Sequence, residues 1–293
     1  MSLHKITVFT GVATALITPH LGGEIDYDAF GNLIDLQIGA GIGALLVAGT
    51  TGESATLRRG EFAKLITYAK ARIDGRVPLL VGCGSNSTEH TLELADIACR
   101  EGADALLAVT PYYNKASDRG ILLHYRALAD HAARPVILYN VPARTGFSMT
   151  MAHYRELAKH ENIVGVKEAS GNLGLVEALC AECGDDLDVY TGNDDQIVAS
   201  MKVGGQGVVS VCSNILPRET IELCRLCASG DWRAAGQRQR ALLPQIQALF
   251  REVNPIPVKY VASLKGLCAA EYRLPLCPPS PETAKLLQSL FYK

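Results

Sequence analysis

The sequence predicts an α/β fold, a closed (β/α)8 TIM barrel with additional C-terminal helices. Short apolar runs of β type alternate eight times with helical stretches, in units of roughly 25 to 30 residues. The runs are predominantly apolar on both faces, as parallel strands covered by helices are. Three further helical stretches follow the eighth unit, without another strand pattern. We therefore expect residues 1–230 to form a catalytic barrel domain and residues 231–293 a helical extension packed on it.

The predicted elements follow one another with little change. Asp26 is a typical N-cap for the first helix, and each strand run is bounded by glycine, proline or polar turn residues. The expected strands are 10–16, 44–47, 77–81, 105–109, 136–139, 163–167, 188–191 and 207–211. Clear helical patterns cover 26–40, 58–73, 87–101, 118–132, 231–250, 256–267 and 281–291. The segment after Tyr139, punctuated by Pro142 and Gly146, is expected to be a loop.

An open, doubly wound sheet is the alternative fold. It would be expected to show a glycine-rich ligand fingerprint after an early strand. The only candidate, Gly39–Gly43, sits at the end of a helix and precedes a strand, which is typical of a turn. No phosphate-binding P-loop pattern occurs either. The sequence therefore favours the closed barrel.

Composition and charge narrow the classes of function. The net charge is −2 and no basic run occurs, so neither nucleic acid nor an anionic membrane surface is indicated as a partner. No segment approaches the roughly 18 uninterrupted apolar residues of a membrane helix, and Met1–Lys5 does not lead into a signal-peptide pattern. We expect a cytoplasmic protein that acts on small molecules.

The nine cysteines raise the question of a metal site. Without a secretory signal they indicate reduced thiols rather than disulfides. Two Cys-x-x-Cys pairs, Cys180/Cys183 and Cys224/Cys227, could form the halves of a zinc site. Each pair lies in an apolar helical pattern, however, where cysteines at i and i+3 pack as small hydrophobes. The histidines at strand ends do not have metal-ligand spacing, and no metal is expected.

The run from Ile163 to Gly171 contains a lysine where an apolar strand ends. By the period-2 rule, Ile163, Gly165 and Lys167 share one side of the strand, and Val164 and Val166 the other. Gly165 would leave space beneath the lysine. Burial penalises the charged form of a lysine, and the neutral amine is the nucleophile that forms an imine with a carbonyl substrate. A lysine that reaches solvent is the alternative.

Active sites of such barrels lie at the C-terminal ends of the strands. Tyr139 ends the strand before that of Lys167 and faces the same way, so its phenol could relay protons to an imine. The hydroxyl and backbone N–H groups of the turn at Thr50 and Thr51 could hold a carboxylate. The planar guanidinium of Arg144 is suited to bind a carboxylate through two hydrogen bonds. The residues that follow the other strand ends are Thr50, Thr51, Tyr112, Tyr113, Gly192 and Asn193. No glycine-rich turn follows strand eight, so we expect an unphosphorylated, carboxylate-bearing substrate.

Four spaced motifs together closely resemble the dihydrodipicolinate synthase family. The match is to the whole chain, and it runs from the first strand through Asn254–Lys259. The motifs are Gly49–Glu53, Pro111–Asn114, Tyr139–Gly146 and Gly165–Ala169. That family belongs to the pyruvate-dependent class I lyases and aldolases. The resemblance implies a lysine Schiff base, no cofactor, and condensation of pyruvate with L-aspartate 4-semialdehyde in diaminopimelate and lysine biosynthesis. It also implies a homotetramer built from tight dimers.

The resemblance assigns roles position by position. Lys167 would form the imine, and Tyr139, Thr51 and Tyr113 would relay protons, with Tyr113 reaching into the neighbouring subunit's site. Substrate contacts are implied for Thr50 and Thr51 (pyruvate carboxylate), Arg144 (aldehyde carboxylate), and the backbones of Gly192 and Val209.

The chain departs from members that are inhibited by lysine. Those bind lysine through a glutamate at the position of His90 and have histidines where this chain has Arg59 and Phe62. Ser54, Ala55, Asn86 and Tyr112 still match that site. Loss of the anionic partner predicts weak or absent inhibition by lysine, although the neighbouring Glu89 is a possible substitute.

Three rival enzymes use the same imine with another electrophile: N-acetylneuraminate lyase, 2-keto-3-deoxy-sugar-acid aldolase, and hydroxyproline-pathway types. Arg144 within its motif favours the synthase over them. A non-catalytic ligand-binding barrel would be expected to have lost the lysine or its relay, and both are present.

Overall fold

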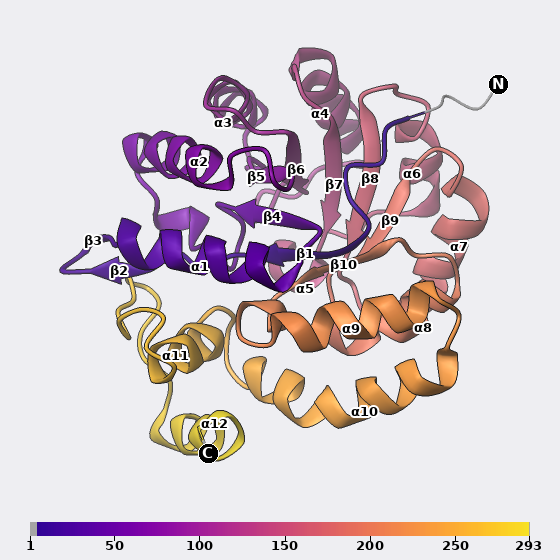
Figure 1. Cartoon of the computed structure of the whole chain (residues 1–293). Coiled ribbons are helices and arrows are strands. Elements are labelled where there is room, and N and C mark those ends of the chain that lie inside the picture. Colours follow the sequence, from indigo (N-terminus) through magenta and orange to yellow (C-terminus); the bar gives the residue numbers. More distant parts are fainter. Residues whose placement is uncertain (1–4, 293) are drawn as a thin grey trace.

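The computed structural model describes residues 5–292, and these form a closed barrel of eight parallel strands surrounded by helices (Figure 1). Residues 1–4, on which the expectation about a signal peptide also rests, lie outside this range, as does residue 293. Around the barrel the strand order is β1-β10-β9-β8-β7-β6-β5-β4, with β4 closing on β1. The strands are β1 (Gly11–Ala15), β4 (Ala44–Val47), β5 (Leu79–Gly82), β6 (Ala105–Val109), β7 (Val136–Asn140), β8 (Ile163–Glu168), β9 (Asp188–Thr191) and β10 (Gly207–Ser210).

Helices connect successive strands on the outside of the barrel, as parallel crossovers require. They are α1 (Tyr27–Ala40), α2 (Arg59–Ile73), α3 (Thr88–Arg100), α4 (Asp118–His131), α6 (Met151–Leu157), α7 (Leu173–Cys183), α8 (Ile197–Lys202) and α9 (Pro217–Ala228). The chain ends with α10 (Trp232–Leu249), α11 (Ile256–Leu264) and α12 (Pro281–Phe291). Figure 1 shows α10 lying along the outside of α8 and α9. Among residues 5–292, no helix is long and apolar enough to cross a lipid bilayer.

The expected fold class and all eight expected strands are confirmed. Asp26 caps α1 by accepting a hydrogen bond from the Ala29 N–H, and Gly41 ends the same helix with φ +88°, a conformation that favours glycine. The supposed fingerprint Gly39–Gly43 is therefore a helix end and turn. Helix α11 stops at Leu264, three residues before its expected end.

Small elements were not expected. A hairpin of two-residue strands, β2 (His20–Leu21) and β3 (Glu24–Ile25), follows β1. The predicted loop after Tyr139 contains a single helical turn, α5 (Pro142–Thr145). Pro142 fits the first turn of a helix because its missing N–H has no partner to lose there.

The core has two layers. Inward-facing strand residues, including Ile137, Tyr139, Tyr190 and Val209, form a cluster inside the barrel. The alternate strand residues, such as Leu138, pack outward against the surrounding helices in a larger cluster. The expected inward direction of Ile137 and Tyr139 is confirmed.

The expected alternation along β8 is wrong at its start. Val136 on β7 pairs with Ile163 on β8, and the next β7 residue, Ile137, pairs with Gly165. The step is therefore one residue on β7 and two residues on β8. This β-bulge places two residues of β8 opposite one step of β7. As a result, Ile163 packs in the outer layer and Val164 inside the barrel, the reverse of the prediction.

The space expected beneath Gly165 is filled. A Cβ at this glycine would lie 2.8 Å from the Asp188 carbonyl oxygen and 3.4 Å from the Tyr190 ring. Tyr190 stacks on Phe9 with ring centroids 4.1 Å apart, and its hydroxyl donates a hydrogen bond to the Phe9 carbonyl oxygen. Gly165 therefore allows close packing of β8 on β9 rather than a cavity.

The cysteine pairs pack as the sequence predicts. Cys183, Cys224 and Cys227 belong to the outer hydrophobic core, and Cys180 packs against it. Burial raises the pKa of the Cys180 and Cys227 thiols to about 11, which favours the protonated form over the thiolate that binds metal.

Candidate active site

Lys167 and Tyr139 are direct partners on β8 and β7, near the C-terminal ends of both strands. Their exposed fractions are 6% and 7%, so both are buried at the mouth of the barrel. The Lys167 Nζ lies 4.3 Å from the centroid of the Tyr139 ring. A primary amine and a phenol are thus held together where a small ligand can enter from the open end of the barrel.

Gly192 follows β9 and packs directly against the lysine side chain. A Cβ at Gly192 would lie 2.8 Å from Lys167 Cε and 2.6 Å from Ala169 Cβ. Real side chains do not approach this closely, so only glycine fits here. Val209 on β10 is buried in the inner cluster together with Tyr139. Gly192 is therefore in contact with the lysine, and Val209 belongs to the same inner cluster as the tyrosine.

Asn254 links two other expected site residues. The Thr51 side chain is buried, and its Oγ1 accepts a 2.9 Å hydrogen bond from Asn254 Nδ2. The Asn254 carbonyl oxygen accepts a 3.1 Å hydrogen bond from Arg144 Nη2. Thr50 precedes Thr51 in the turn after β4, and its carbonyl oxygen accepts from the Glu53 N–H. The position of Asn254 in the sequence indicates no role for it, although it is the first residue of the segment Asn254–Lys259, where the resemblance to the family ends.

Tyr113 is not brought into this group. Its side chain is 90% exposed, and its φ of +73° is unusual for a residue other than glycine. It projects from the loop after β6, where its backbone N–H makes a long hydrogen bond to the Thr145 carbonyl oxygen. A tyrosine held outward in this way cannot act on Lys167 of its own chain without a change in the loop.

Asp194, just past β9, is a site feature that sequence reasoning missed. Its fully buried carboxylate accepts hydrogen bonds from the Ser210 hydroxyl and from the Val211 and Cys212 N–H groups. Burial raises the pKa of Asp194, while these donors and the Lys167 ammonium oppose the rise. The donors at the end of β10 are thus occupied by a carboxylate of the protein itself.

Glu168, the neighbour of Lys167, is a second missed feature. Its buried carboxylate accepts hydrogen bonds from Asn140 Nδ2, the Tyr154 hydroxyl and the Ser170 N–H. Burial and the nearby carboxylate raise the pKa of Tyr154 well above its usual value, so the phenol stays protonated and donates. These contacts tie the ends of β7 and β8 together and fix the strand that carries Lys167.

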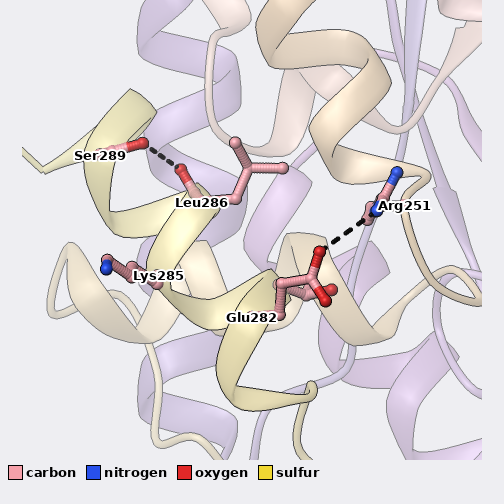
Figure 2. Close-up of a pocket in the computed structure, with 6 residues that line it drawn as sticks. Arg251, Glu282, Lys285, Leu286 and Ser289 are labelled. Atoms are coloured by element: carbon pink, nitrogen blue, oxygen red, sulfur yellow. Dashed lines mark hydrogen bonds and ion pairs between the residues drawn. The ribbon is translucent and has the colours of Figure 1, made fainter.

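A surface hollow of about 360 Å³ lies elsewhere, between α12 and Arg251, which follows the end of α10 (Figure 2). Arg251 faces Glu282 across it at 3.4 Å, and Ser289 bonds back to the Leu286 carbonyl oxygen within the helix. Both charged side chains are mostly exposed, so their pair is weak. None of the expected site residues lines this hollow.

A closed parallel barrel with a buried lysine beside a tyrosine at its mouth is typical of lyases and aldolases that bind carbonyl substrates as an imine. The profile of the dihydrodipicolinate synthetase family matches residues 8–292. The 4-hydroxy-tetrahydrodipicolinate synthase of Kosmotoga olearia is 43% identical over 284 residues, 96% of this chain and 97% of the relative.

Solved structures agree with this similarity. The dihydrodipicolinate synthase from Aquifex aeolicus superposes with a TM-score of 0.95 at 40% identity, covering 96% of this chain and 97% of that one. A structure described as the first monomeric dihydrodipicolinate synthase variant gives 0.95 at 39% identity, with 97% and 96% covered. The chain therefore belongs to the dihydrodipicolinate synthase family, and the expectation of an enzyme of the lyase class is confirmed.

Proposed function

We propose that this protein is a 4-hydroxy-tetrahydrodipicolinate synthase, which condenses pyruvate with L-aspartate 4-semialdehyde in diaminopimelate and lysine biosynthesis. The observation that carries the proposal is the buried amine of Lys167 beside the Tyr139 ring at the barrel mouth. Two findings support the choice of reaction: the chain belongs to the family, and relatives that align with nearly its full length are named as this synthase.

In the proposed reaction, the neutral Lys167 amine adds to the ketone carbon of pyruvate and loses water to give an imine. Removal of a methyl proton gives an enamine, whose carbon attacks the aldehyde carbon of the second substrate. The amino group of that substrate then displaces Lys167 from the imine carbon and closes the ring. The lysine imine supplies the electron sink throughout, so the reaction needs no metal or organic cofactor.

Each step moves a proton, and we assign these transfers to the hydroxyls of Tyr139, Thr51 and Tyr113. The position of Tyr139 over Lys167 supports its role as the group that exchanges protons with the imine. Thr50 and Thr51 would bind the pyruvate carboxylate, and Arg144 the carboxylate of the aldehyde substrate. The backbones of Gly192 and Val209 would line the site.

The neighbourhood of Asp194 supports an unphosphorylated substrate. In many barrels of this type, backbone N–H groups after the last strands bind phosphate. Here the Val211 and Cys212 N–H groups already donate to Asp194, and its negative charge repels a phosphate.

We infer a homotetramer of tight dimers, in which Tyr113 completes the site of the neighbouring subunit. Its 90% exposure and its left-handed backbone support this role, because an isolated chain leaves the ring without contacts to pack against. We further propose a cytoplasmic location, and a division into a barrel domain (1–230) and a packed helical extension (231–293). The hydrogen bond from Gln239 Nε2 of α10 to the Asp194 carbonyl oxygen supports the close packing of this extension.

The proposed function is tested by measuring pyruvate consumption with L-aspartate 4-semialdehyde, beside a panel of other aldehydes that includes N-acetylmannosamine. Turnover with the semialdehyde alone is expected. Turnover with another aldehyde in its place would keep the imine chemistry and reject this choice of substrate.

Lysine is expected to inhibit the enzyme weakly or not at all. Glu93, on the same helix as His90, already contacts that histidine at 3.4 Å and Arg59 at 3.9 Å, so this carboxylate is engaged and does not replace the missing glutamate at position 90. Inhibition curves with L-lysine check this, and His90→Glu is expected to strengthen inhibition. Half-inhibition of the unmodified enzyme by sub-millimolar lysine would contradict the prediction.

Gly192→Ala is expected to impair imine formation. The added methyl would overlap Lys167 Cε and Ala169 Cβ, so the amine must shift. We expect kcat/KM for pyruvate to fall by about tenfold or more, because small displacements of a reacting group are costly. Gly39→Ala is the matched control, since a Cβ there meets no atom within 4 Å. Equal activity of the two variants would show that the close packing at Gly192 is unimportant.

A further inference from the structure

A buried ion pair joins the C-terminal extension to the turn after β4. The Lys259 Nζ on α11 donates to Glu53 Oε1 at 2.5 Å and to His20 Nδ1 at 2.9 Å. All three side chains are fully buried. In Figure 1, the hairpin β2–β3 that carries His20 lies beside the segment that contains α11.

The charges in this cluster are balanced locally. Burial and the Lys259 charge lower the pKa of His20 to about 3, so the imidazole is neutral and its Nδ1 accepts from the lysine. Glu53 also accepts a long hydrogen bond from the Arg273 N–H. Buried ion pairs contribute little net stability, because desolvation offsets their attraction. Such a pair does, however, hold its two chain segments in the one geometry in which both charges are satisfied.

Glu53 sits in a tightly specified turn. Its φ is +56°, an unusual value for a side chain of this size, and its N–H donates to the Thr50 carbonyl oxygen. The Thr18 hydroxyl donates to the Gly52 carbonyl oxygen at 2.7 Å. Thr51 lies between Thr50 and Gly52, whose carbonyl oxygens both accept these hydrogen bonds.

The same two chain segments meet a second time at Thr51 itself. Asn254, five residues before Lys259, donates from Nδ2 to Thr51 Oγ1 at 2.9 Å. The threonine oxygen thus accepts a hydrogen bond from the Asn254 amide, which leaves its own O–H as a donor for another group. The orientation of this hydroxyl therefore depends on how the segment 254–259 is held against the turn.

We propose that Glu53 and Lys259 are positioning residues for Thr51. Their buried pair clamps the start of α11 to the turn, so that Asn254 fixes the Thr51 hydroxyl in its proton-transfer orientation. The inference rests on the proposed function, in which Thr51 relays protons. It gives the C-terminal extension a direct part in the active site of the barrel.

The test is a double-mutant cycle between Glu53→Gln and Thr51→Val, measured by steady-state kinetics with pyruvate and L-aspartate 4-semialdehyde. Glu53→Gln keeps the size of the side chain and removes its charge. We expect it to lower kcat about tenfold in the native background, and less than about twofold where Thr51 is already valine. Borohydride trapping of pyruvate on Lys167 should persist in both variants. A merely structural role would reduce kcat by the same factor in both backgrounds.

The double variant Glu53→Gln/Lys259→Met guards against a single variant that fails to fold, because it leaves no unpaired buried charge. We expect it to fold and to show the same loss of kcat. Lys70→Met, which removes a half-buried ion pair with Asp104 outside the site, is the control and should keep full kcat. Full kcat in the folded double variant, or equal factors in the cycle, would overturn the inference. A native enzyme without turnover would instead reject the proposed function.

Discussion

Lys167→Ala is expected to lower turnover by about 10⁴-fold or more, since the substitution removes the nucleophile on which every later step depends. Loss should appear in kcat and in covalent trapping alike. The fold should persist, because the side chain lies at the open end of the barrel and alanine introduces no buried charge. The measurement is pyruvate consumption with L-aspartate 4-semialdehyde, together with circular dichroism of the variant.

Lys202→Ala is the matched control, because it removes an exposed lysine at the end of α8. It should retain full activity. Substantial turnover by Lys167→Ala would contradict the assignment of the nucleophile. A non-catalytic barrel, the other class weighed for this sequence, would keep its response to ligand in the same variant.

Tyr139→Phe is expected to lower kcat by about 10²- to 10⁴-fold, the usual contribution of a positioned acid–base group. The ring remains, so packing in the inner cluster and the contact with Lys167 should be kept. Imine formation should slow, yet trapped imine should still accumulate over long incubation. Pre-steady-state trapping with borohydride separates this slow formation from a loss of pyruvate binding.

Tyr154→Phe provides the comparison for Tyr139→Phe. It also removes one buried phenol hydroxyl, but that hydroxyl donates to Glu168, and the ring in contact with the lysine is that of Tyr139. We expect lower stability and a much smaller loss of kcat. Similar kinetic defects in the two variants would argue against a specific proton relay through Tyr139.

Regular parts of the fold are predictable because strand and helix periods are visible in the sequence. The eight apolar runs and the Asp26 cap are examples. The bulge at Ile163 and Val164 is not, because an extra residue in a uniformly apolar run leaves no mark on the pattern. The hairpin β2–β3 is too short to show any period.

Predictability of the site divides in the same way. Lys167 and Tyr139 follow from the rule that strand ends meet at the barrel mouth, and the structure places them in contact. Asn254 and Lys259 lie just before and within α11, more than 200 residues after the turn they contact, with separations of 203 and 206. No local pattern specifies a contact of that range, so it emerges only with the folded chain.

The most direct test of the central claim is to incubate the native enzyme with pyruvate, reduce it with borohydride, and locate the modification by peptide mass spectrometry. One modified residue is predicted, Lys167, carrying the mass of one pyruvate less one oxygen atom, and L-aspartate 4-semialdehyde added before reduction should release it. A modification on another lysine, or no covalent adduct in an enzyme that turns over both substrates, would contradict the account.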